Sequence, residues 1–193
     1  MQPSETAEKP PEGLSQGSPH TDRSGGLKAV EGQTERKVKT MKRYYIAYGS
    51  NLNVPQMRWR CPDARVIGTG TLKDMALLFK GSRTGSYLTI EEEKGAEVPV
   101  TVWEVSEKDE KALDRYEGYP RFYYKKDMKV EVTGIRSGKT RVRDAFVYIM
   151  REDSEPGIPT RDYFRTCLEG YRTFGFDEKF LVEAVKRSEE MMR

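Results

Sequence analysis

Between residues 65 and 150 the sequence alternates segments of strand character with turns, and this alternation limits the folds that the chain can adopt. The segments expected to form strands are 65–70, 73–80, 86–92, 98–105, 122–132 and 141–150. Lys94-Gly95 predicts a turn between 86–92 and 98–105, and Ser137-Gly138 predicts the turn of the last hairpin. Consecutive hairpins with few intervening helices favour a mainly antiparallel sheet that curls toward a barrel.

Helices are expected around this sheet rather than within it. A short helix should follow the strand 44–48, with Asn53 as its N-cap and Pro55 in its first turn, and a second should run over 106–117 with Ser106 as its N-cap. The apolar positions of 162–174 and 177–192 recur at helical spacing. The predicted fold class is therefore α+β, a small, mainly antiparallel β-barrel with surrounding helices.

Residues 1–40 differ in composition from the rest of the chain. They contain no aromatic residue and are interrupted repeatedly by proline and glycine, so they cannot bury enough apolar surface to offset the entropy lost on ordering. We expect a disordered N-terminal extension over 1–40 and one domain over 41–193. The chain offers neither a signal-peptide core nor a run of about 20 apolar residues that could span a membrane. A cytoplasmic protein without membrane association is the corresponding expectation.

The chain has a single histidine, His20, and two cysteines far apart in sequence, Cys61 and Cys167. Nucleophile systems that depend on imidazole and histidine-rich or cysteine-rich metal sites are therefore not expected, and neither is a cofactor. If the protein is an enzyme, carboxylates, tyrosines or lysines must move its protons. The net charge is +3, but basic and acidic residues alternate along 125–144, which argues against nucleic acid. A small basic interaction domain remains an alternative.

A polar segment, Tyr48-Gly49-Ser50-Asn51-Leu52, ends the apolar strand 44–48 abruptly. Successive N–H groups that leave a strand can converge on an anion such as a carboxylate, and Ser50 and Asn51 add side-chain donors. Glycine gives the backbone conformational freedom at this turn. The same residues also suit an ordinary connection from a strand to a helix, in which Ser and Asn satisfy their own backbone.

Glu117 is the strongest candidate for chemistry. It follows the helix predicted from Ser106 and precedes Gly118, and the C-terminal end of a helix is unfavourable for a carboxylate because the helix dipole is negative there. The dipole and any burial would both raise the pKa of this carboxyl toward the range useful for a general base. The alternative is a solvated glutamate before a glycine C-cap.

Together these residues resemble the γ-glutamylcyclotransferase-like family, which includes the plant AIG2-like and bacterial butirosin-type branches. The resemblance begins at 45–53, includes Gln56-Met57 and 60–62, and is strongest at 113–120, with Tyr123 following. It implies a small mixed barrel that needs no metal or cofactor, with Glu117 as the catalytic acid/base. It also implies that a γ-glutamyl substrate is bound by Tyr48, Gly49, Ser50, Asn51, Leu52, Tyr123 and Tyr148, with Tyr163 as a further candidate.

The function that this resemblance implies is cyclisation of a γ-glutamyl amide to 5-oxoproline, with release of the amine or amino acid. A non-catalytic module that binds γ-glutamyl compounds or amino acids with the same fold is the alternative. The sequence does not select the leaving group or the oligomeric state.

Overall fold

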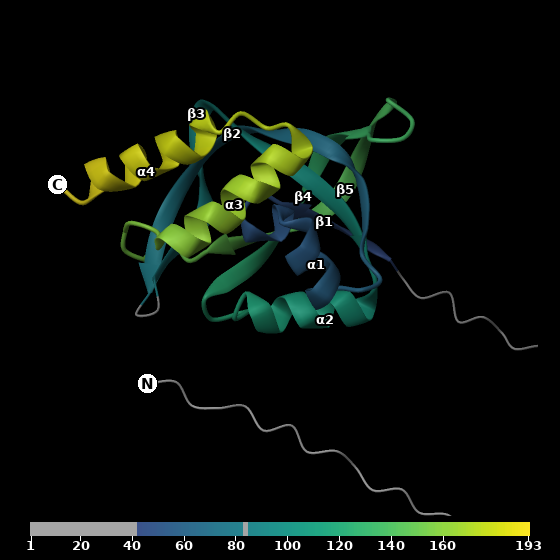
Figure 1. Cartoon of the computed structure of the whole chain (residues 1–193), viewed down its shortest axis with the longest axis horizontal. Helices are drawn as coiled ribbons and strands as arrows, with labels where there is room; N and C mark the ends of the chain where they lie inside the picture. The colour runs from purple at the N-terminus through teal and green to yellow at the C-terminus, as the bar shows by residue number, and fades with distance from the viewer. Residues whose placement is uncertain (1–41, 83–84) are drawn as a thin grey trace, which may run out of the picture. The chain divides into compact units, whose positions relative to one another are not determined.

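Five strands close into a barrel in the computed structural model, which describes residues 42–82 and 85–193 (Figure 1). The strands are β1 (Arg43–Ala47), β2 (Arg65–Ser82), β3 (Gly85–Val105), β4 (Tyr123–Gly134) and β5 (Thr140–Met150). Their order is β1-β3-β2-β4-β5. All neighbours pair antiparallel except β1 and β5, which pair parallel through Tyr45 with Phe146 and Ile46 with Val147. The predicted barrel is confirmed, and this parallel pair is what closes it.

The four segments predicted between residues 65 and 105 form two long strands. β2 and β3 pair along nearly their whole length, so the prediction of a hairpin turn at Lys94-Gly95 was wrong. The register passes from Lys73 opposite Glu97 to Met75 opposite Glu92, which leaves residues 93–96 in a wide bulge. Gly95 has a φ of +85° there. Turn-forming residues can thus serve a bulge as well as a hairpin, and local sequence does not separate the two.

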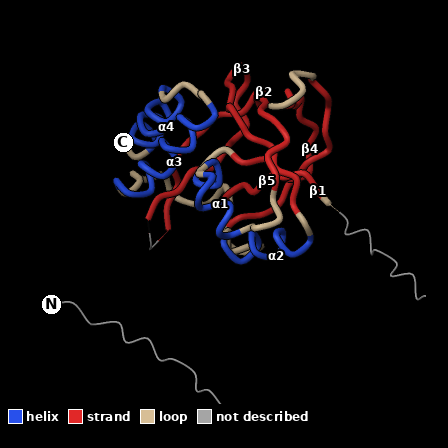
Figure 2. Tube along the Cα trace, turned by 45° about the vertical axis from the view of Figure 1, so that its right-hand side comes forward, coloured by secondary structure: helices blue, strands red, loops and turns tan. Residues whose placement is uncertain are grey.

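The helices lie outside the barrel (Figures 1 and 2). They are the 3₁₀ helix η1 (Ser50–Leu52) and the α-helices α1 (Val54–Arg60), α2 (Glu107–Tyr116), α3 (Arg161–Phe174) and α4 (Lys179–Met191). α4 packs on β2, where the Ser188 hydroxyl accepts a hydrogen bond from the Phe79 N–H at 2.8 Å. α3 packs on η1 and so supports the polar segment that follows β1.

The predicted helix starts are confirmed at two N-caps. The Asn53 side chain accepts from the Gln56 N–H, and Ser106 forms a capping box with Asp109. Each cap satisfies N–H groups that the first helical turn leaves without a partner. α1 and α2 thus begin where local sequence places them.

The core fills the barrel and extends beneath α3 and α4. Its fully buried side chains include Ile46, Phe79, Ile90, Val102 and Phe146 from the strands and Leu181 from α4. No helix within 42–82 or 85–193 is long and apolar enough to cross a membrane. The predicted extension over 1–40 lies outside the described residues.

Candidate active site

The polar segment after β1 forms a tight turn that leads into η1. The Leu52 N–H donates to the Gly49 carbonyl at 2.9 Å, and the Asn53 N–H donates to the Ser50 carbonyl at 3.0 Å. The N–H groups of Gly49, Ser50 and Asn51 have no acceptor in the part of the chain that the structure describes. Three consecutive donors are therefore left for a ligand.

Gly49 lies close to two other residues of the site. Gly49 has a φ of −120° and a ψ of −135°, a combination outside the regular β and helical regions, and the expected conformational role of this glycine stays a prediction. A Cβ at this position would lie 3.4 Å from both the Leu88 Cβ and the Tyr163 hydroxyl oxygen. These are ordinary van der Waals distances, so a Cβ would fit in contact with both groups.

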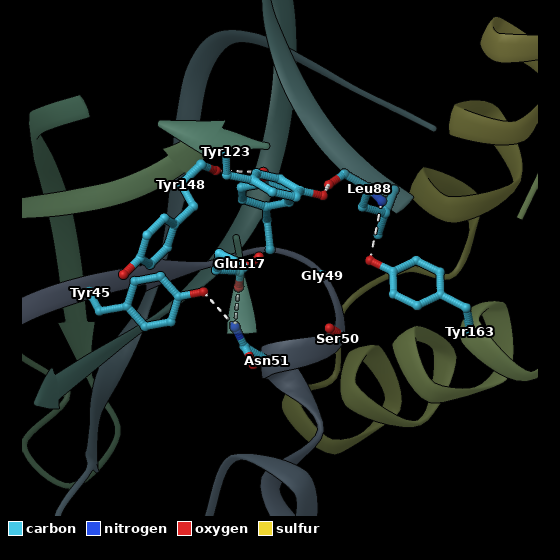
Figure 3. Close-up of a pocket in the computed structure, with 10 residues that line it drawn as sticks. Tyr45, Gly49, Ser50, Asn51, Leu88, Glu117, Tyr123, Tyr148 and Tyr163 are labelled. Carbon is cyan, nitrogen blue, oxygen red and sulfur yellow. Dashed lines mark hydrogen bonds between the residues drawn. The ribbon is translucent and has the colours of Figure 1, made fainter. Parts of the chain in front are cut away.

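Glu117 is placed by the end of α2. Its N–H donates to the Leu113 carbonyl at 2.8 Å, and the Leu113 side chain anchors the helix in the core. Gly118 follows with a φ of +62°, a left-handed conformation that favours glycine and turns the chain away. The helix predicted over 106–117 is confirmed, and it presents the Glu117 carboxyl toward the turn after β1 (Figure 3).

Glu117 and the turn lie at one small pocket (Figure 3). The pocket is lined by Tyr45, Tyr48, Gly49, Ser50, Asn51, Leu88, Glu117, Tyr123, Tyr148 and Tyr163. Segments that are far apart in the sequence thus supply one small, largely aromatic cavity with a single carboxylate.

The Asn51 side chain connects three of its neighbours. Its amide nitrogen donates to the Tyr45 hydroxyl and to Glu117 Oε1, each at 2.8 Å, and its Oδ1 accepts from Arg60 Nη1. Both amide hydrogens are therefore used within the protein, so the prediction that this side chain donates to a ligand needs correction. Among the described residues Glu117 Oε2 has no partner. That oxygen is left for a substrate proton.

Burial raises the pKa of Glu117 from its usual 4.5 to about 7, and the Arg60 charge and the Asn51 hydrogen bond oppose the rise. Its position at the helix C-terminus acts in the same direction as burial. The sequence predicted a raised pKa from these two causes. A carboxyl with this pKa is populated in both protonation states near neutral pH, as a group that both accepts and donates a proton requires.

Three of the pocket tyrosines use their hydroxyls to bind the protein itself. Tyr48 donates to the carbonyl of Tyr148 at 2.6 Å, and the Tyr148 hydroxyl donates to Asp114 at 2.6 Å. Tyr123 donates to the Leu88 carbonyl at 2.8 Å. These predicted site residues therefore line the pocket with their rings, while their hydroxyls fix β3, β5 and α2 around it.

Leu52 does not line the pocket. Its side chain is fully buried, and its N–H is bonded to Gly49, so the expectation that it contacts a ligand is corrected. Leu52 instead packs against α3, where a Cβ on Gly170 would come within 2.5 Å of the Leu52 Cβ. Its role is to hold η1 against this helix.

The sequence predictions omitted Tyr45 and Leu88, and they did not assign a role to Arg60. Tyr45 and Tyr48 are three residues apart, which places them on opposite faces of a continuous strand. β1 ends at Ala47, and the turn brings both rings to the pocket. The Tyr45 hydroxyl accepts from Asn51, so it still has a hydrogen to donate. Leu88 comes from β3 and carries no local polar signal.

Neither thiol nor metal chemistry is supported by the donor groups. Burial raises the pKa of both Cys61 and Cys167 to about 12, so both thiols are protonated near neutral pH. Within residues 42–82 and 85–193, no group of three or more histidine, cysteine, aspartate and glutamate side chains is arranged to hold a metal ion.

A family model described as "Gamma-glutamyl cyclotransferase, AIG2-like" matches residues 45–165, a range that contains both the turn after β1 and Glu117. The chain belongs to this family. A curated relative, the γ-glutamylcyclotransferase of Bos taurus, is 35% identical over 96 residues, which cover 46% of this chain and 50% of the bovine protein. The matched region thus spans about half the length of that relative.

Solved structures of the same fold extend the likeness over most of the chain. A structure named γ-glutamyl cyclotransferase has a TM-score of 0.61 and 25% identity, and the match covers 79% of this chain and 87% of that one. A human protein described as uncharacterised has a TM-score of 0.57 and 26% identity, over 78% and 86% of the two chains. The cyclotransferase-like fold predicted from the sequence is therefore confirmed.

Proposed function

We propose that this γ-glutamylcyclotransferase-like protein cyclises γ-glutamyl amides to 5-oxoproline and releases the amine. The observation that carries the proposal is the placement of the raised-pKa carboxyl of Glu117 in the same small pocket as the free N–H groups of Gly49, Ser50 and Asn51. One acid/base group and one set of anion donors are what this intramolecular reaction needs.

The substrate carries its own nucleophile, so positioning accounts for much of the catalysis. The N–H groups of 49–51 would bind the α-carboxylate, and the Tyr45 hydroxyl offers a further donor. This contact would fold the γ-glutamyl chain so that its α-nitrogen approaches its own γ-carbonyl carbon.

Glu117 would then move protons in two stages. Its carboxylate takes a proton from the substrate α-ammonium and releases it to solvent, and the freed amine attacks the γ-carbonyl carbon to form the lactam C–N bond. Glu117 takes a second proton from the attacking nitrogen, which becomes the lactam N–H, and gives it to the leaving amine as the tetrahedral intermediate collapses and the original amide C–N bond breaks. The carboxylate is regenerated, so the cycle needs no other reactant.

The test is incubation of the purified full chain with γ-glutamyl amino acids, γ-glutamyl amines and γ-glutamyl-lysine isopeptides, followed by detection of 5-oxoproline by mass spectrometry. We expect turnover of at least one class by the wild type and by Glu189→Gln, a matched change at an exposed position on α4. We expect none from Glu117→Gln. Binding of a γ-glutamyl compound without 5-oxoproline release would favour the alternative, a non-catalytic binding module of the same fold.

A further inference from the structure

Arg60, at the end of α1, is held between that helix and α2 without a carboxylate partner. Its guanidinium carbon lies 3.3 Å from the centre of the Tyr116 ring. In the described part of the chain no carboxylate oxygen lies within ion-pair distance of it, and its Nε is buried without a hydrogen-bond partner. Desolvation of a guanidinium is costly. Among the described residues, the Arg60 side chain makes its hydrogen bond to Asn51, through Nη1.

That hydrogen bond fixes which way the Asn51 amide points. Arginine can only donate, so the Asn51 atom that it contacts must be the oxygen. The amide nitrogen is thereby turned toward Glu117 Oε1 and the Tyr45 hydroxyl. A flipped amide would instead place its oxygen against the Glu117 carboxylate, which is repulsive.

We infer that Arg60 is a positioning residue for Glu117 and acts through the Asn51 amide. Arg60 does not touch the carboxyl itself, and it has no place among the residues that line the pocket. With Asn51 bonded to Oε1, the free Oε2 is directed to the substrate. Asn51 is thus held by a protein partner on each side. This role of Arg60 rests on the proposed function and adds to it the residue that orients the acid/base group.

The platform beneath Arg60 belongs to the same arrangement. Tyr116 directly precedes Glu117 at the end of α2, and its hydroxyl lies 3.1 Å from the Ser50 hydroxyl. α2 thus supplies both the ring that holds the guanidinium and the carboxyl that the guanidinium orients. A planar guanidinium can stack on the ring and donate sideways at once, which a lysine ammonium does not reproduce.

Arg60 is also the one cation among the described groups that act electrostatically on Glu117. The other titratable groups coupled to this carboxyl are the phenols and a thiol, namely Tyr45, Tyr48, Tyr123, Tyr148, Tyr163 and Cys61. Burial raises the pKa of each of these groups, so they are neutral near pH 7 and cannot replace the Arg60 charge. Loss of Arg60 should therefore make the Glu117 proton harder to remove.

The direct test is the Glu117 pKa, measured by ¹³C NMR of the full chain with labelled glutamate and assigned with Glu117→Gln. We expect Arg60→Met to raise it by about one unit, a tenfold change in proton affinity, because the opposing charge and the ordered amide are both lost. Arg58→Met, an equal charge change at an exposed position on the same helix, should leave it unchanged. Arg60→Gln serves as a second variant if Arg60→Met does not fold.

The kinetic arm rests on the proposed function. Arg60→Met should lower kcat at pH 7 by about 10-fold to 100-fold with little change in KM, and it should move the acidic limb of the pH–rate profile upward. Arg58→Met should retain wild-type kinetics. An absence of wild-type turnover would remove the proposed function but leave the NMR measurement decisive. A Glu117 pKa within 0.3 unit of wild type in a folded Arg60 variant, or kcat lowered with no displacement of the pH profile, would overturn the inference.

Discussion

Glu117→Gln should abolish turnover and at the same time stabilise the fold above neutral pH. The amide keeps the shape of the carboxyl and can still accept the hydrogen bond from Asn51 to Oε1, but it cannot take up a proton. It also removes a partly buried negative charge from the end of α2. Catalysis and stability should therefore change in opposite directions.

The size of the change in the free energy of unfolding follows from the pKa of Glu117, which is about 7 in the folded protein against 4.5 for the free side chain. A carboxyl whose pKa is raised by folding contributes stability when protonated, and this contribution is lost as the pH rises from about 4.5 through 7. Between pH 5 and pH 8 the loss amounts to about 2.5 kcal/mol. Glu117 is partly exposed, and solvent screening reduces the expected difference to roughly 1–2 kcal/mol.

The assay is thermal unfolding at a series of pH values, followed by circular dichroism. For a domain of this size, 1 kcal/mol shifts Tm by about 2–4 °C, so Glu117→Gln should melt about 2–8 °C above wild type at pH 8. The difference should shrink toward pH 5, where Glu117 is protonated. Glu189→Gln should show no comparable pH-dependent difference, because this glutamate is exposed on α4.

Two results would refute this reasoning. A Glu117→Gln protein that melts at the wild-type temperature or below it throughout pH 5–8 would mean that burial does not penalise the carboxylate. A variant that retains most of the wild-type 5-oxoproline release would remove Glu117 from its proposed role, whatever its stability.

Further predictions concern the turn, its support and the rest of the chain. Amidation of the substrate α-carboxylate should lower kcat/KM by about two orders of magnitude or more, since each charge-assisted hydrogen bond is worth roughly 1.5–3 kcal/mol. Gly49→Val should lower kcat/KM similarly. Equal kcat/KM for the acid and the amide substrate would exclude carboxylate binding by the turn. Gly170→Ala should destabilise the protein by about 1–3 kcal/mol in thermal unfolding, because its Cβ would lie 2.5 Å from the Leu52 Cβ, whereas Thr173→Ala on the exposed side of α3 should cost less. A chain that starts at Met41 should keep its Tm and activity, since residues 1–40 contain no aromatic residue; a markedly lower Tm would contradict this. A chelator should leave turnover unchanged, and activity that a divalent ion restores after chelation would disprove the metal-free mechanism.

Sequence alone determined the features that depend on near neighbours. Ser106 and Asn53 cap helices because their side chains reach N–H groups three residues ahead. Gly118 ends α2 through its own left-handed backbone, which fixes where Glu117 stands relative to the helix dipole. The direction of the Glu117 pKa shift could therefore be predicted, together with the segments that have strand character, although four of these segments join into two strands.

Tertiary structure decided the features that depend on partners distant in the sequence. Closure of the barrel needs the parallel pairing of β1 with β5, and the bulge at Gly95 exists because β3 continues along β2 beyond it. The same turn residues are compatible with a hairpin, so only the paired strand distinguishes the two outcomes.

Asn51 shows most clearly what the sequence determines and what the tertiary structure determines. Its sequence position identifies a polar donor next to a strand end, but a side-chain amide has a fixed number of hydrogen bonds to give. Whether they reach a ligand or the protein is settled by Tyr45, Arg60 and Glu117, which approach from β1, α1 and the end of α2. Residue type thus set what this side chain can do, and the fold set what it does, because hydrogen-bond capacity is local and the partners that use it are not.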